Sequence, residues 1–397
     1  MWQVMSLGDV CTISSSKRIF AKEYKTEGIP FYRGKEIIEK HNGSTVSTEL
    51  FISLERYEEI KSKYDVPKKG DILLSSVGTL GVPWLVNEDN FYFKDGNLTW
   101  LRSNEKIIPD YLYFWLTSDE AQNQIDSKCI GSTQKALTIE ALKKFKITLP
   151  NVEVQKKIIS MIKPIELKID INRRINNNLE QQAKIIFNHL VINNPNFHSF
   201  KLTPLSELCK LITKGTTPTT LGKNFTNSGI NFIKVESILE NHSFNREKFS
   251  YINKTTNFIL KRSILHSGDI LFTIAGTLGR FALVDDSILP ANTNQAVAII
   301  RVNKDKILPE YLYSSFLGNW HNDYYKRHVQ QAVQANLSLT TIKSLLIPML
   351  PQAELQKYME LVHPIIKYMK KNEKENYLLA EQKNFILPKL MTGELTP

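Results

Sequence analysis

The sequence predicts a mixed α/β chain in which two α+β domains, related by a pseudo-two-fold axis, are separated by two long antiparallel coiled-coil helices. Three observations predict this fold class. Segments recur at a nearly constant interval along the sequence. Each repeat begins with a mixture of strand and helix patterns and ends with a purely helical pattern. Both helical parts carry a heptad pattern. The predicted order is a domain over 1–150, a helix over 151–192, a domain over 193–350 and a helix over 351–397.

The size and composition are those of an ordinary globular protein with two or three domains. Of the 397 residues, 42% are hydrophobic and 23% are charged, which excludes a largely disordered or collagen-like chain. Lysine and arginine exceed aspartate and glutamate by 51 − 40 = 11. A positive surplus of this size indicates a polyanionic partner without identifying it.

Three cysteines, Cys11, Cys129 and Cys209, are too few and too scattered for a disulfide framework or a zinc site. They suit a reducing compartment, and Cys11 and Cys209 are interpreted as small buried apolar residues. No uncharged apolar run reaches the ~18 residues of a membrane span. The first residues also lack the basic and apolar regions of a secretion signal. We therefore expect a soluble, cytoplasmic protein without membrane partners.

Six segments occur twice in the same order, 198 to 201 residues apart. The strongest pair is Gly70–Gly81 with Gly268–Gly279, in which eight of twelve residues are identical. The other pairs begin at Cys11 and Cys209, Gly28 and Gly229, Pro109 and Pro309, Gln134 and Gln334, and Leu149 and Leu350. An interval this long is not a solenoid period, so it indicates duplication of a whole domain with the helix that follows it.

Each domain is predicted to combine short strands with a few helices. Runs rich in β-branched, aromatic and leucine residues lie between Gly, Asn and Pro turn signals. A helix is expected over 109–118, where Pro109 opens it and Asp110 suits its first turn. After Pro150 and after Pro351 the pattern is helical, to about Leu190 and about Leu390.

Both helical segments carry apolar residues in an alternating four–three spacing, which is the pattern of a coiled-coil seam. The first seam consists of Ile158, Ile162, Ile165, Ile169, Asn172, Asn176, Leu179, Ala183, Ile186 and Leu190. The second consists of Val362, Ile365, Met369, Asn372, Asn376, Leu379, Lys383, Ile386 and Leu390. We expect the two helices to pack on each other, the alternative being that each packs only on its own domain.

Asparagines stand at the same two layers of both seams, Asn172 and Asn176 in the first and Asn372 and Asn376 in the second. A buried asparagine weakens a coiled coil but determines its register and partner, so these four are interpreted as register residues. Prolines 164 and 364 lie early in the helices and predict either a kink or a later helix start.

The predicted helices are long enough to separate two DNA-reading domains. A helix from Val152 to Leu190 would be about 58 Å long at ~1.5 Å per residue. One turn of B-DNA is ~34 Å, so two domains held apart in this way could contact one face of a duplex about a turn apart.

No catalytic constellation is present. The sequence lacks a P-loop, an H-E-x-x-H motif and paired metal-ligand cysteines. Gly78 and Gly81 are interpreted as turn glycines, and Pro109 as a helix start rather than part of a nuclease motif. The segment 194–197 resembles a methyltransferase loop but is interpreted as a helix terminator, because the second copy has no equivalent. We therefore predict a chain that is not an enzyme and binds no metal.

Polar and basic loops at equivalent places in the two copies are candidate DNA contacts. The residues predicted to contact mainly phosphate are Lys17, Arg18, Lys214 and Lys234. The candidates for base reading, for which glutamine can bond adenine twice, are Arg33, Lys35, Gln134, Arg280, Gln330 and Gln331. Further polar contacts are expected from Ser76, Thr79, Lys135, Thr216, Thr217 and Thr277. For each of these, a solvated loop residue is the alternative interpretation.

The whole chain resembles the specificity subunit of type I restriction–modification enzymes. The motifs that carry the resemblance are TKGTTP with GINFIKVESI, the doubled GDILxxxxGTLG, the doubled P-[DE]-Y-L-Y, the doubled LP…E-x-Q-K and the terminal FILPKLMTGEL. Singly these motifs are loose, but doubled and in this order they are specific. The first copy departs from the pattern, with SSSKRIF where the second has TKGTTP.

The resemblance implies that each domain is a target recognition domain for one half of a bipartite, asymmetric DNA sequence, and that the helices set the spacing between the halves. It further implies two methyltransferase (M) subunits docked on the helices, with endonuclease/translocase (R) subunits joining through them. No cofactor is expected on this chain, and S-adenosylmethionine, ATP and magnesium are expected on the partners. Two other functions remain open: a single-chain restriction/modification enzyme with an unrecognised catalytic site, and a coiled-coil adaptor.

Overall fold

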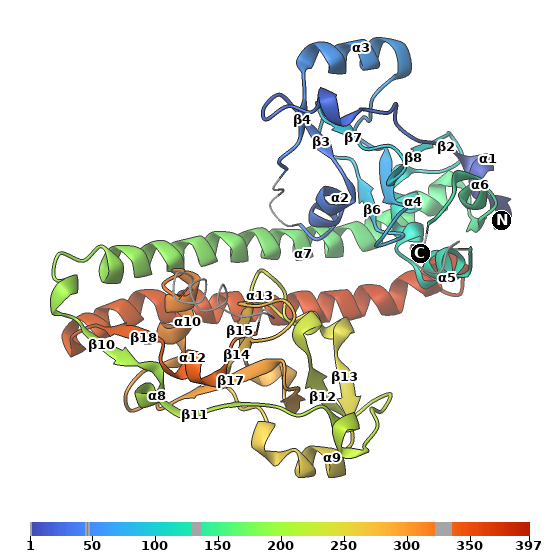
Figure 1. Cartoon of the computed structure of the whole chain (residues 1–397). Coiled ribbons are helices and arrows are strands. Elements are labelled where there is room, and N and C mark those ends of the chain that lie inside the picture. The colour runs from blue at the N-terminus through green and yellow to red at the C-terminus, as the bar shows by residue number, and fades with distance from the viewer. Residues whose placement is uncertain (1, 44–45, 47, 129–135, 322–335) are drawn as a thin grey trace. The chain divides into compact units, whose positions relative to one another are not determined.

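The computed structural model describes residues 2–43, 46, 48–128, 136–321 and 336–397. Packing divides the chain into two compact units. Unit 1 comprises Met1–Ile171 with Asn376–Pro397, and unit 2 comprises Asn172–Glu375. Each unit therefore contains one α+β domain and a part of both long helices, which cross the division (Figure 1). This grouping differs from the predicted segments, which separated the helices from the domains.

The strands of unit 1 form three small sheets. The largest is antiparallel, in the order β2 (Cys11–Ser14), β8 (Leu98–Ser103), β5 (Ile72–Ser75) and β6 (Pro83–Leu85). In the second, β3 (Ile29–Tyr32) is antiparallel to β4 (Phe51–Ile52) and parallel to β7 (Tyr92–Phe93). The third is the antiparallel pair of β1 (Gln3–Ser6) and β9 (Lys146–Leu149).

Unit 2 repeats this topology strand for strand. Its largest sheet has the order β11 (Cys209–Lys214), β17 (Val297–Val302), β14 (Ile270–Thr273) and β15 (Phe281–Leu283). Here β12 (Ile230–Ile233) is antiparallel to β13 (Ser250–Ile252) and parallel to β16 (Ala291–Thr293), and β10 (Lys201–Pro204) pairs with β18 (Leu346–Met349). The same strand order and directions in both units confirm the duplication of a whole domain.

The shorter helices also recur in order. Unit 1 has α1 (Leu7–Val10), α2 (Gly34–His41), α3 (Leu54–Tyr64), α4 (Pro109–Leu116), α5 (Asp119–Lys128) and α6 (Ile139–Lys143). Unit 2 has α8 (Leu205–Leu208), α9 (Lys254–Ile259), α10 (Pro309–Leu317) and α12 (Leu339–Lys343). The helix expected over 109–118 is confirmed as α4, with Pro109 in its first turn and an end two residues earlier.

The doubled GDIL motif builds the turn that enters the central strand of each large sheet. Gly70 and Gly268 adopt φ values of 94° and 90°, a region that glycine enters without strain. The carboxylates of Asp71 and Asp269 then accept the backbone N–H three residues earlier, at 2.9 and 2.8 Å. The identity of this motif in the two copies therefore has a structural cause.

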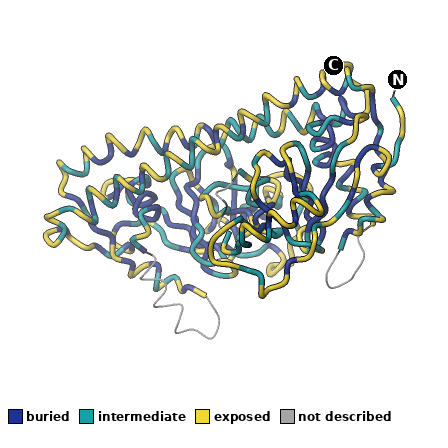
Figure 2. Tube along the Cα trace, turned by 90° about the horizontal axis from the view of Figure 1, so that it is seen from above, coloured by how far each residue is buried: buried dark blue, intermediate teal, exposed yellow. Residues whose placement is uncertain are grey.

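Two long helices complete the architecture: α7 (Val152–Phe187), which continues as a π-helical turn over Asn188–Ile192, and α13 (Gln352–Thr392). Both begin before their prolines and continue through them, so the alternative of a later helix start is wrong. Along both helices buried and exposed residues alternate, as expected for amphipathic helices (Figure 2).

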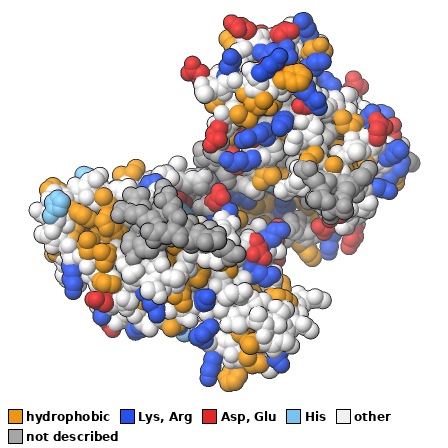
Figure 3. Space-filling view, viewed as in Figure 1, with side chains coloured by type: hydrophobic (Ala, Val, Ile, Leu, Met, Phe, Trp, Pro, Cys, Tyr) orange, Lys and Arg blue, Asp and Glu red, His pale blue; other side chains and the backbone are white. Residues whose placement is uncertain are grey.

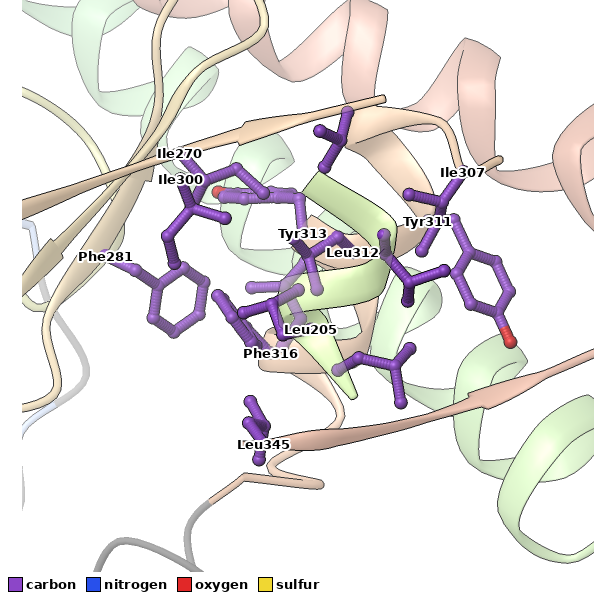
Figure 4. Packing of buried hydrophobic residues seen from close by; sticks show 14 of the residues in the cluster. Leu205, Ile270, Phe281, Ile300, Ile307, Tyr311, Leu312, Tyr313, Phe316 and Leu345 are labelled. Carbon is purple, nitrogen blue, oxygen red and sulfur yellow. The ribbon is translucent and has the colours of Figure 1, made fainter. Parts of the chain in front are cut away.

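The main core of each unit lies between its large sheet and its part of the helices. In unit 2, Ile270 and Ile300 of the sheet, Leu312 and Phe316 of α10 and Leu205 of α8 pack together (Figure 4). The helices contribute Ala183 and Phe187 from α7 and Val362 and Ile366 from α13. In unit 1 the corresponding contributions come from Ile158, Ile162, Leu387, Leu390 and Met391. The alternative that each helix packs only on its own domain is therefore wrong, because both helices contribute to the core of each unit.

Two predictions about single features are tested by the fold. Cys11 is buried, and this burial raises the pKa of its thiol to about 12, as expected for an inert core residue. Cys209 is only partly buried, although burial raises the pKa of its thiol to about 12 as well. Within the described ranges, none of the helices combines the length and the low polarity that a bilayer crossing needs.

Candidate nucleic-acid interface

The segment that follows β2 in unit 1 presents Lys17 to solvent. Its backbone N–H donates to the Tyr92 hydroxyl at 2.7 Å, and its Nζ lies 4.9 Å from the ring centroid of the exposed Tyr64. Lys17 has no carboxylate partner within the described part of the chain. The neighbouring Arg18 does, since its Nε donates to Asp95 at 2.7 Å. Lys17 is therefore the better placed of the two for a phosphate.

Arg33 stands where β3 ends and α2 begins, and its guanidinium is already engaged. It is 2.8 Å from a carboxylate oxygen of Glu36, whose other oxygen accepts the Arg33 backbone N–H at 2.8 Å. Burial opposes ionisation of Glu36, but these hydrogen bonds hold the pKa of that carboxyl below its ordinary value. Lys35 lies 3.6 Å from Glu39. Base reading by Arg33 would thus require it to exchange partners.

Lys234 occupies the matching place in unit 2, directly after β12. Its Nζ lies 3.7 Å from Glu236 and 4.9 Å from the ring centroid of Phe225. Its backbone caps the turn over Val235–Ser237, as Arg33 caps α2. The two copies therefore place a cation at the same strand end, although Lys234 holds its carboxylate more loosely than Arg33 does.

The end of β11 and the stretch that follows it carry three of the predicted residues. Lys214 is exposed, and the next residue, Gly215, packs so closely that a Cβ there would lie 1.8 Å from the Thr293 carbonyl oxygen. Only glycine fits this approach. The close contact anchors the loop on the second sheet of unit 2 and so determines where Lys214 emerges.

Thr217 and Thr216 are held by hydrogen bonds from two other segments, which carry Gln295 and Arg262. The Thr217 N–H and hydroxyl both donate to the side-chain oxygen of Gln295, at 3.2 and 2.5 Å. Arg262 donates to the Thr216 hydroxyl and the Lys214 carbonyl, each at 3.4 Å. Arg262 is exposed and was not predicted from the sequence, because it joins the loop from 46 residues away.

The predicted residues at the glycine turns of the doubled GDIL motif differ in how far they are exposed. Thr79 and Thr277 are exposed on equivalent turns of the two units. Ser76 is only 4% exposed, its hydroxyl is 2.6 Å from that of Thr99, and it donates to the Leu74 carbonyl at 3.2 Å. The prediction that Ser76 contacts DNA is therefore corrected: a buried hydroxyl whose hydrogen bonds are made inside the fold has a structural role.

The Arg280 side chain is held by the segment around Ile238 and Glu240 in unit 2. Its two terminal nitrogens donate to the Ile238 carbonyl at 3.2 Å and to Glu240 at 2.9 Å. Glu240 is largely exposed, so this pair can open at little cost. The equivalent residue in unit 1, 198 positions earlier, is Val82. The two domains therefore present different chemistry at this point.

Four predicted residues, Gln134, Lys135, Gln330 and Gln331, lie outside the described residues. Over the described face of unit 1 in Figure 3, Lys and Arg side chains are interspersed with Asp and Glu. The described residues also hold no group of three or more His, Cys, Asp or Glu placed for a metal ion.

The register asparagines join the two long helices within each unit. In unit 2 the Asn372 amide donates to the Asn176 oxygen at 2.8 Å, and the Asn176 amide donates to the Met369 carbonyl at 3.0 Å. Asn172 donates to Glu375 at 2.8 Å. The partner numbers fall along α13 as they rise along α7, so the helices are antiparallel.

Unit 1 holds its own part of the helix pair in the same orientation. Lys383, the charged seam position, lies 2.7 Å from Glu166, and the Asn376 amide is 3.5 Å from the Ile169 carbonyl. Asn172 and Asn372 are only 1% and 2% exposed, whereas Asn176 and Asn376 are half-buried.

A cluster of titratable groups lies where α7 meets the domain in unit 2. Burial raises the pKa of Glu180 to about 7, against the opposing effect of Lys184 and together with the charge of Glu373. Glu180 is 3.6 Å from His242, whose ring stacks on Phe281 and whose pKa is lowered by burial to about 4. Between about pH 4 and pH 7 the Glu180 carboxyl is therefore largely neutral beside a neutral imidazole.

Comparison with known families gives two matches along the chain. The model described as the type I restriction modification DNA specificity domain matches residues 1–181 and again residues 199–382. The second match begins 198 residues after the first, which is the interval of the repeats.

Curated relatives carry corresponding names. A protein of Haemophilus influenzae named as a type I restriction enzyme specificity subunit is 34% identical over 168 residues, 42% of this chain and 40% of that protein. The type I restriction enzyme MjaIX specificity subunit of Methanocaldococcus jannaschii is 23% identical over 435 aligned residues, 99% of this chain and 93% of that protein. The chain thus spans well under half of the first relative and nearly all of the second.

A solved structure with the same fold is available for comparison. The type I restriction–modification S subunit from M. genitalium superposes with a TM-score of 0.54 and 14% identity, covering 98% of this chain and 96% of that one. At this identity the likeness concerns the architecture, which is that of two α+β domains with two long helices.

Proposed function

The chain belongs to the type I restriction modification DNA specificity family, as the specificity subunit rather than a catalytic one, and from this premise we propose that its two units each read one half of a bipartite, asymmetric DNA target. The observation that carries the proposal is one topology present twice with different residues at equivalent loops. Because the scaffold is the same and the loops differ, the two half-sites should differ as well.

The loops after β2 and β11 supply the phosphate contacts in this proposal. Lys17 lies three residues after β2 and Lys214 is the last residue of β11; both are exposed, and neither has a carboxylate partner within the described residues. Such cations attract the DNA backbone and orient the domain without reading sequence. Base reading is assigned to residues around the glycine turns, where the units differ as Val82 and Arg280 do.

The long helices are proposed to set the spacing of the half-sites and to dock two methyltransferase subunits. Large apolar side chains are exposed at equivalent places: Met161 and Leu361 at 42% and 51%, and Ile185 and Phe385 at 64% and 66%. Exposed apolar positions that recur with the repeat are what two identical partners would require. Endonuclease/translocase subunits would join through these partners.

We expect the cofactors on the catalytic partners rather than on this specificity subunit. S-adenosylmethionine, ATP and magnesium are proposed to bind the partner subunits, with none bound by this chain. A cytoplasmic location is proposed as well, because the target is DNA and the few cysteines suit a reducing compartment.

The test combines the full chain with its methyltransferase subunits and a duplex containing the target found by mapping methylated adenines. We expect Lys17→Ala and Lys214→Ala each to weaken binding to every sequence and to lower the salt slope by ~1. Lys156→Ala is the control, since it removes an exposed lysine that pairs with Glu153 on α7.

Two results would count against the proposal. Binding that does not distinguish the methylated target from unrelated DNA would remove the reading function altogether. Cleavage or methyl transfer by the chain alone, with magnesium and S-adenosylmethionine, would favour the single-chain enzyme instead.

A further inference from the structure

Each unit exposes one large apolar side chain in the loop that leads from the first strand of its large sheet to its second sheet. These residues are Phe20, 56% exposed, and Leu221, 48% exposed. Single exposed apolar residues are common on protein surfaces and need no explanation by themselves. Here, however, the position recurs in both copies, so the two residues have to be considered together.

The equivalence of the two positions rests on matching contacts around them. The ring of Tyr24 lies 5.3 Å from that of Phe31, and the ring of Phe225 lies 5.3 Å from that of Phe232. Both pairs are separated by the same number of residues, and each first ring is followed by a residue bridged to the neighbouring strand. Four residues before the first ring stands the exposed apolar side chain in both units.

A lysine follows two residues later in both copies, as Lys22 and Lys223. Both lysines are exposed, and neither has an ion-pair partner in the part of the chain that the structure describes. The repeated unit is thus an apolar side chain beside an uncompensated cation. In unit 1 it lies on the loop that carries Lys17, and in unit 2 on the loop that follows Lys214; these two lysines are the phosphate contacts proposed above.

Both apolar residues are held by short turns rather than by free loops. The Phe20 N–H donates to Glu23 at 2.8 Å, and Glu23 in turn lies 2.9 Å from the Arg56 guanidinium. Leu221 ends a 3₁₀ turn that Gly222 closes at a φ of 64°, its N–H donating to the Thr219 carbonyl at 3.1 Å. The turns differ in detail, but both constrain the backbone that carries the apolar group.

We propose that Phe20 and Leu221 are apolar wedges, each pressing into a base step of its own half-site while Lys22 and Lys223 hold the adjacent phosphates. This inference rests on the proposed DNA-reading function and adds specificity-determining residues to it. Phe and Leu are side chains that proteins insert between base pairs, where they unstack the step and bend the duplex. Flexible steps deform at lower cost, so a wedge selects sequence without a hydrogen bond to any base.

The experiment places 2-aminopurine at successive positions of each half-site and measures its fluorescence when the full chain binds together with its methyltransferase subunits. We expect an increase at one step in each half-site. Phe20→Ala should abolish the increase in the first half-site only and weaken binding about tenfold, and Leu221→Ala should do the same in the second. Phe20→Leu, which installs the residue of the other copy, should restore much of the binding.

Phe258→Ala is the matched control, because Phe258 is 74% exposed and the position 200 residues earlier is Glu58. Melting curves of all variants should coincide with that of the parent, since only exposed side chains change. Unchanged affinity and fluorescence in both alanine variants, with a parent that still selects its target, would overturn the wedge alone. A parent without sequence selection would overturn the proposed function and the wedge with it.

Discussion

Asn372→Ala removes one partner from the buried hydrogen bond that joins the two long helices in unit 2. Asn372 is 2% exposed, and its amide donates to the Asn176 oxygen at 2.8 Å. The alanine leaves the oxygen of the half-buried Asn176 without this donor and also creates a small cavity at the buried position of Asn372. A buried polar group that loses its partner costs about 1–3 kcal/mol, so we expect the helix pair to open more easily by that amount.

Replacement of both partners should behave differently. In Asn176→Leu combined with Asn372→Leu neither partner of this hydrogen bond remains, and this one layer of the seam becomes apolar, whereas the Asn172–Glu375 contact is kept. We expect this double variant to be as stable as the parent or more so, because apolar side chains of similar size often replace a buried polar pair at no cost. What it should lose is the preference for one register.

Hydrogen exchange of α13 amides, read by mass spectrometry, measures the opening locally in a chain that need not unfold in one step. An increase of 1–3 kcal/mol corresponds to exchange roughly 5 to 150 times faster between residues 365 and 380. Lys374→Ala is the control on the same helix, since Lys374 is exposed. Exchange in Asn372→Ala that matches this control would refute the claim that the asparagine layer holds the helices together.

Two further predictions concern the same helices. Burial raises the pKa of Glu180 from 4.5 to about 7, so the folded chain keeps a proton that the unfolded chain releases, and stability should fall as pH rises through this window. In Glu180→Gln this decline in the free energy of unfolding should be smaller, by at most about 3 kcal/mol. Unfolding midpoints of both proteins measured between pH 4 and 8 test this. Ile185→Glu and Phe385→Glu, at 64% and 66% exposed positions, should each cost about tenfold in methyltransferase affinity, and native mass spectrometry should then find one bound subunit instead of two. Two subunits retained in either variant would contradict docking at that place.

The architecture was predictable because the sequence contains two copies of the same domain and helix. Matching segments at one interval revealed the duplication, and the four–three spacing revealed two paired helices with asparagines at buried layers, as Asn172 and Asn372 show. The sequence did not reveal how the helices divide between the units. That division depends on which apolar residues share a core, as Ile158 of α7 and Leu390 of α13 do in unit 1.

The candidate interface was predictable only as a set of loops. Ser76 resembles an exposed turn hydroxyl in sequence, yet its backbone N–H donates to the Asn97 carbonyl and its buried hydroxyl lies beside that of Thr99. Arg262 was missed because nothing near it in sequence relates it to Thr216. The commitment of Arg33 to Glu36 likewise depends on side-chain geometry.

The division of the helices has a consequence for how the polypeptide matures on the ribosome. Unit 2 is one continuous stretch of chain, whereas the core of unit 1 contains Leu387, Leu390 and Met391, which are translated after all of unit 2. The domain encoded first must therefore wait, with apolar surface still uncovered, until the domain encoded second has emerged. Chaperone demand during synthesis should fall on the amino-terminal copy.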